Sequence, residues 1–151
     1  MKIKTLLILI SLVLYGCSKP EKKLTKTPEE RVQSIERIIT SNAKLPSKII
    51  SADYIAETQG DTSSLGPTDF KFYLRIKVSP EDIASWARGL KKPYNNCTHY
   101  SQPKSPQIWW LKKTAFANTD LYETKSYFNR YNGWILLDRQ QSYIYVYTFT
   151  M

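Results

Sequence analysis

Between residues 70 and 78 apolar and polar side chains alternate without a break, and this stretch constrains the fold more than any other part of the chain. The apolar set is Phe70, Phe72, Leu74, Ile76 and Val78, and the intervening set is Lys71, Tyr73, Arg75 and Lys77. Because successive side chains of a strand point to opposite faces, the pattern predicts a strand with one face on a core and the other toward solvent. Such a strand is stable only within a larger sheet.

Other segments supply the expected partner strands. Residues 48–58 predict a less regular strand, and the loop-type residues 60–68 (GDTSSLGPT) would join it to the alternating stretch. The dipeptide Asn132-Gly133 indicates a turn. In the second half, strands are expected at residues 121–130, 134–137 and 142–150, and a strand or a buried crossing segment at 108–111 (IWWL).

Two segments carry the pattern of a helix start. Thr27-Pro28-Glu29-Glu30 combines a capping residue, a proline suited to the first helical position and a glutamate that completes a capping box. Apolar residues then recur up to Ile39 at helical spacing, which predicts an amphipathic helix of about 15 residues. Ser79-Pro80-Glu81-Asp82 repeats this pattern and predicts a second, shorter helix with Trp86 on its apolar side. Residues 91–107 are expected to be a long loop.

The N-terminus reads as an export signal. Met1-Lys2-Ile3-Lys4 is basic, and residues 5–15 are apolar over a length too short to cross a bilayer. Leu14-Tyr15-Gly16-Cys17 resembles the lipobox of bacterial lipoproteins. That resemblance implies cleavage between Gly16 and Cys17, a diacylglycerol thioether on Cys17 and acylation of its amine. The alternative is an uncleaved anchor with a chance cysteine.

The resemblance also implies an address. Ser18 follows the cysteine, where an aspartate would mark retention in the inner membrane, so the expected place is the outer membrane, facing the periplasm. Residues 1–16 are then a signal peptide, and residues 17–26 are the lipidated cysteine with a flexible basic tether.

The helix and strand patterns together predict the fold class. We expect residues 27–151 to form a single α+β domain, with two short helices and a mainly antiparallel sheet of about five or six strands.

The sequence offers little catalytic chemistry. Cys97 and His99 are the one pair that suggests a thiol nucleophile or the start of a metal site. Two residues that are two apart on an extended segment point to opposite faces, and no third ligand or orienting group can be identified. We therefore expect no metal, no cofactor and no enzyme activity. Cys97 is then a free or intermolecular thiol, or a small buried hydrophobe.

Two groups of residues suggest binding instead. Lys71, Tyr73, Arg75 and Lys77 share one face of the alternating strand, where three cations and a ring could meet an acidic partner, although this face could equally be the solvent side of the sheet. The second group is aromatic and comprises Trp109, Trp110, Tyr143, Tyr145 and Tyr147, which could serve as contacts or as core.

These observations favour a membrane-anchored periplasmic lipoprotein with a non-catalytic binding role, as an assembly accessory or an immunity-type protein. The expected partners are membrane lipid through acylated Cys17 and an acidic envelope protein or polymer. The net charge of +9 does not indicate nucleic acid, because an exported protein meets no genome. A small envelope hydrolase or thiol enzyme that uses Cys97 and His99, and a structural spacer without a discrete site, are the alternatives.

Overall fold

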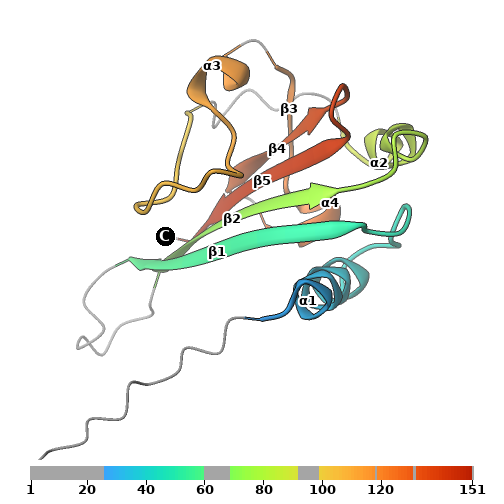
Figure 1. Ribbon diagram of the computed structural model, residues 1–151, viewed down its shortest axis with the longest axis horizontal. Coiled ribbons are helices and arrows are strands. Elements are labelled where there is room, and N and C mark those ends of the chain that lie inside the picture. Colours follow the sequence, from blue (N-terminus) through green and yellow to red (C-terminus); the bar gives the residue numbers. More distant parts are fainter. Residues whose placement is uncertain (1–25, 60–68, 92–98, 118, 131, 151) are drawn as a thin grey trace, which may run out of the picture.

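A five-stranded antiparallel sheet forms the centre of the protein (Figure 1). The computed structural model describes residues 26–59, 69–91, 99–117, 119–130 and 132–150. Its strands are β1 (Ser51–Gln59), β2 (Asp69–Lys77), β3 (Leu121–Tyr122), β4 (Gly133–Asp138) and β5 (Tyr143–Phe149), and its helices are α1 (Pro28–Thr40), α2 (Ile83–Arg88), α3 (Lys113–Phe116) and α4 (Lys125–Phe128). The strand order is β1-β2-β5-β4-β3. The protein is therefore an α+β fold with an antiparallel sheet, as predicted.

The alternating stretch is β2, and it lies inside the sheet between β1 and β5. In this register Arg75 lies opposite Asp53 on one side and Tyr145 on the other. Tyr73 lies opposite Ile55 and Tyr147 in the same way. Cross-strand neighbours on one face touch, so this register decides which polar and aromatic side chains meet.

One face of the sheet carries the first core. Helices α1, α2 and α4 cover it, as Figure 1 shows. Leu74 and Ile76 of β2 pack there against Ile35 of α1 and Trp86 of α2, and all four are fully buried. Helix α1 starts with the predicted capping box: Glu30 N donates to Thr27 Oγ1 at 3.2 Å, and Thr27 N donates to Glu30 Oε2 at 2.8 Å.

The opposite face carries a second, aromatic core. It contains Tyr73, Trp110, Leu111, Phe116, Leu121, Trp134, Leu136, Tyr145 and Tyr147. The layer above the sheet consists of residues 99–117, which we call the covering segment and which includes α3 (Figure 1). Both faces of the sheet therefore carry a core, and the prediction that one face of β2 points to solvent was wrong at Tyr73.

In the second half of the chain one prediction was wrong, and one that left two alternatives open is resolved. Of residues 121–130, only Leu121–Tyr122 form a strand, and α4 begins three residues later, at Lys125. Asn129 ends α4 in the left-handed conformation, and Thr124 Oγ1 donates to the carbonyl of Arg130 at 2.8 Å, which closes this short segment into a compact turn. Residues 108–111 are not a strand but the second alternative, a segment that buries Trp110 and Leu111. The described residues thus form four helices, whereas the sequence predicted two. The two additional helices, α3 and α4, have four residues each.

Candidate functional site

The structure divides the predicted binding residues into two groups. Tyr73 and Trp110 are 1% and 7% exposed and belong to the aromatic core, so these two cannot form a contact surface. Their edge-to-face contact, with ring centroids 5.2 Å apart, holds the covering segment on the sheet. Lys71, Arg75, Lys77 and Trp109 are half-buried and remain accessible.

Arg75 is the centre of the accessible group. Its Nη2 donates to Asp53 Oδ2 at 2.6 Å, between adjacent residues of β1 and β2. Arg31 of α1 approaches the other oxygen of the same carboxylate, with Nη2 3.6 Å from Oδ1. Two guanidinium groups therefore share one carboxylate, and the cluster keeps an excess of positive charge.

Two aromatic rings lie close to the Arg75 guanidinium. The Arg75 Cζ atom lies 4.6 Å from the ring centroid of Tyr143 and 6.0 Å from that of Trp109. Lys77 Nζ lies 4.5 Å from the same Tyr143 ring and donates to the carbonyl of Gln141. Both distances to Tyr143 fall within the range of favourable cation–π contacts. We call Asp53, Arg75, Lys77, Trp109 and Tyr143 the Arg75 surface.

Tyr145 lies beneath this surface, opposite Arg75 on β5. Burial raises the pKa of the Tyr145 phenol, and the Arg75 guanidinium acts in the opposite direction. Tyr145 therefore remains a neutral phenol near neutral pH and does not cancel the charge of Arg75.

Hydrogen bonds of two indole N–H groups and one tyrosine hydroxyl hold the covering segment on the sheet beside the Arg75 surface. Trp110 Nε1 donates to the carbonyl of Ser101 at 2.9 Å, and Trp134 Nε1 donates to that of His99 at 3.3 Å. The Tyr73 hydroxyl forms a hydrogen bond with Ser101 Oγ at 3.0 Å. Burial raises the pKa of Tyr73 to about 12, so this hydroxyl keeps its proton at neutral pH. Buried rings with satisfied polar groups fix the position of the segment that carries Trp109.

Sequence reasoning missed Asp53 of the Arg75 surface and Arg31, which shares the Asp53 carboxylate with Arg75. Neither residue belongs to a recognisable sequence motif. Tyr143 was grouped with Tyr145 and Tyr147, which are buried, whereas Tyr143 is half-buried and contacts both cations. The available signal was the predicted hairpin of residues 48–78, because its correct register places Asp53 opposite Arg75.

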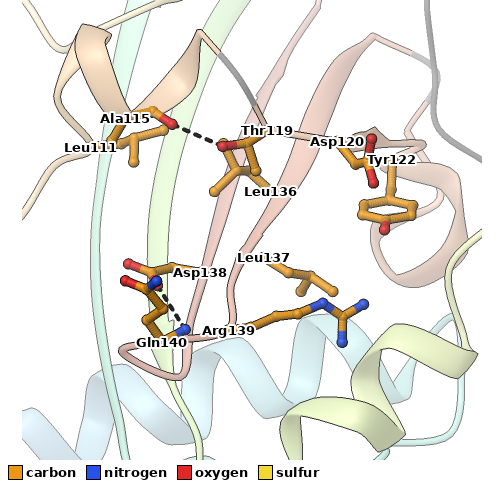
Figure 2. A pocket seen from close by; sticks show the side chains of 10 residues that line it. All are labelled: Leu111, Ala115, Thr119, Asp120, Tyr122, Leu136, Leu137, Asp138, Arg139 and Gln140. Carbon is orange, nitrogen blue, oxygen red and sulfur yellow. Dashed lines mark hydrogen bonds between the residues drawn. The ribbon is translucent and has the colours of Figure 1, made fainter.

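Two hollows on the surface do not contain the Arg75 surface. The first has a volume of ≈ 450 Å³ and lies between α3, β3 and the β4–β5 turn (Figure 2). In Figure 2 several of its polar groups serve local turns: Thr119 Oγ1 donates to the carbonyl of Ala115 at 2.8 Å, and Asp138 Oδ1 accepts from Gln140 N at 3.1 Å. The second, of ≈ 560 Å³, has apolar lining from Ile38, Phe70, Phe72 and Phe128, and Arg130 also lines it.

The residues expected to carry other chemistry give no further site. Gly16, Cys17 and Cys97 lie outside the described residues. His99 is exposed, and its backbone carbonyl is occupied by Trp134. Within the described ranges, no group of three His, Cys, Asp or Glu side chains is placed to hold a metal ion.

One property of the helices and three comparisons with known proteins complete the description. Among the described residues, no helix has the length and apolar character needed to span a membrane. No protein-family model, curated protein or solved structure matches this chain.

Proposed function

We propose that this chain is a cell-envelope lipoprotein, held by lipid on Cys17, whose folded body binds a partner that presents anionic groups and performs no catalysis. The lipobox-like Leu14-Tyr15-Gly16-Cys17 after a short apolar stretch supports the anchor. Ser18 supports the outer membrane, facing the periplasm. The Arg75 surface is the proposed binding site.

The arrangement around Arg75 carries this proposal. Arg31 and Arg75 share the carboxylate of Asp53, and Arg75 and Lys77 both contact the Tyr143 ring. Arg75 is held in position by that carboxylate and by the Tyr143 ring, while 21% of its side chain stays exposed. An arginine that is already oriented loses little conformational entropy when it binds a carboxylate or phosphate, so the surface is prepared for an anion.

The anchor is tested by mass spectrometry of the N-terminal peptide of the native protein. We expect a peptide that begins at Cys17 and carries diacylglycerol and an amide-linked acyl chain. Cys17→Ser is expected to leave the precursor uncut or to misplace the protein. An unmodified thiol at position 17 would refute the anchor, and the envelope address would then have no support.

The binding site is tested with the mature protein purified from membranes in neutral detergent and used to capture anionic partners from an envelope extract. We expect saturable capture that the double variant Arg75→Gln/Lys77→Gln weakens about tenfold or more, since each lost charge-assisted hydrogen bond is worth about 1.5–3 kcal/mol. The matched control is Lys44→Gln, an exposed lysine beside α2. Equal capture by the double variant and the control would refute this assignment of the site.

A further inference from the structure

Ile108 and Trp109 form an exposed apolar tip on the covering segment. The Ile108 side chain is fully exposed, at 106%. Trp109 is half-buried, and its ring contacts that of Trp110, with centroids 5.7 Å apart and planes at 89°. The buried Trp110 therefore supports the tip from below. An aliphatic residue and a tryptophan held at the surface in this way are typical of proteins that contact the interfacial region of a bilayer.

The charge of the covering segment has one sign. Residues 99–117 contain Lys104, Lys112 and Lys113, all exposed, and no Asp or Glu. The Arg75 surface adjoins the segment through the Trp109 ring, 6.0 Å from the Arg75 guanidinium carbon. Glu57 of β1 accepts from the backbone N of Lys104 at 2.7 Å, so the three lysines leave this region with a net positive charge. A basic segment that carries an apolar tip is complementary to a layer of anionic headgroups.

The chain toward Cys17 leaves the body next to the same cluster. Arg31 Nη1 donates to the carbonyl of Lys26, the first described residue, at 3.2 Å. The same guanidinium approaches Asp53, which pairs with Arg75. Residues 18–26 join Cys17 to this point, and nine residues span at most about 30 Å. A lipid on Cys17 would therefore hold the Arg75 surface close to the bilayer.

We infer that the anionic partner of the Arg75 surface is the lipid surface of the membrane that holds the protein. Ile108 and Trp109 enter the boundary between headgroups and acyl chains, and the lysines of the covering segment, with Arg75 and Lys77, face anionic headgroups. The lipid on Cys17 and the covering segment then form two contacts, and the body rests on the bilayer in one orientation. This inference rests on the proposed anchor.

The test uses the mature lipidated protein reconstituted into vesicles that contain a doxyl-labelled lipid as fluorescence quencher. Trp86 and Trp134 are fully buried and Trp110 is 7% exposed, so quenching from the bilayer reports mainly on Trp109. We expect quenching in vesicles of phosphatidylcholine with phosphatidylglycerol, and less in phosphatidylcholine alone or at high salt. The conservative variant Trp109→Phe is expected to lose the quenched component while its thermal unfolding stays close to that of the parent protein.

Matched variants separate the two parts of the contact. Removing charge by Lys104→Gln/Lys112→Gln/Lys113→Gln is expected to lower the equilibrium constant for docking about fivefold for each cation, whereas Lys44→Gln has no effect. Ile108→Ser is expected to reduce it as well, whereas Ile38→Ser, at an isoleucine 40% exposed on α1, does not.

The outcomes distinguish this inference from the proposed function. Lipidated protein whose Trp109 is not quenched in anionic vesicles would overturn the inference and leave the anchor intact. Quenching that is the same in neutral vesicles would also overturn it, because headgroup charge would then play no part. Protein without lipid on Cys17 would instead refute the proposed function, and mass spectrometry of the sample establishes this before reconstitution.

Discussion

At Gly133 the backbone conformation and the close packing leave no room for a side chain. It has a φ of 110°, a region that residues with a Cβ rarely adopt, and a Cβ there would overlap the carbonyl oxygen of Tyr147 on β5. Gly133→Ala is therefore expected to destabilise the protein by at least about 2 kcal/mol, through backbone strain and loss of the close approach between β4 and β5. Denaturant unfolding of the parent and the variant measures this difference.

The neighbouring residue provides the control. Asn132 contributes its backbone carbonyl, which accepts from Thr148 Oγ1 at 2.8 Å, and Asn132→Ala keeps that carbonyl. We expect a change within about 0.5 kcal/mol. Equal destabilisation by the two variants would show that the turn, and not the conformation of Gly133, is the sensitive feature.

Among the elements, α1 depends most directly on a local signal. Thr27→Ala removes one half of the capping box with Glu30 and is expected to cost about 0.5–2 kcal/mol of the free energy of unfolding. Thr27→Ser retains the hydroxyl and should stay close to the parent protein. Hydrogen exchange resolves where the effect lies: the first turn of α1 should lose protection first, and unchanged exchange there would contradict the role of the cap.

The elements that the sequence predicted well are those set by local patterns. The capping box and the period of Ile35 and Ile39 indicated α1, and strict alternation indicated β2. The predictions that failed depend on contacts between residues far apart in the sequence. Nothing near Tyr73 in the sequence says that Trp110 will cover it, so a face that alternation assigned to solvent became a core.

The candidate site was predictable in part for the same reason. Arg75 and Lys77 were identified because they share one face of a recognisable strand. Asp53 and Arg31 were not, since their roles depend on strand register and on where α1 packs. Residues 121–130 failed for a local reason: Tyr127 and Phe128 have strand-type side chains, but the left-handed Asn129 and the Thr124–Arg130 hydrogen bond close the segment into a helical turn.

At the scale of the whole molecule, each core contains a buried tyrosine with a strongly raised pKa. Burial raises the pKa of Tyr73 in the aromatic core and of Tyr127 in the first core to about 12 each. The Tyr127 hydroxyl donates to the carbonyl of Trp86 at 2.7 Å, which links α4 to α2. Deprotonation of these phenols therefore opposes packing on both faces of the sheet.

The sign of the resulting pH dependence follows from the direction of these shifts. An unfolded tyrosine titrates near pH 10, whereas Tyr73 and Tyr127 in the folded protein titrate near 12, so the unfolded chain binds fewer protons between these values. Stability is fully present below about pH 10 and is lost as the pH rises toward about 12. We expect the midpoint of thermal unfolding to fall over this interval, and tyrosinate absorbance to rise in step with unfolding.

Tyr127→Phe should make this fall in the midpoint less steep, because it removes one of the two phenols with a raised pKa. The variant also leaves the Trp86 carbonyl without its partner, so its stability at neutral pH is lower than that of the parent protein. A parent protein whose midpoint stays constant up to pH 12 would contradict the burial of both phenols, and with it the two-core arrangement that positions the Arg75 surface.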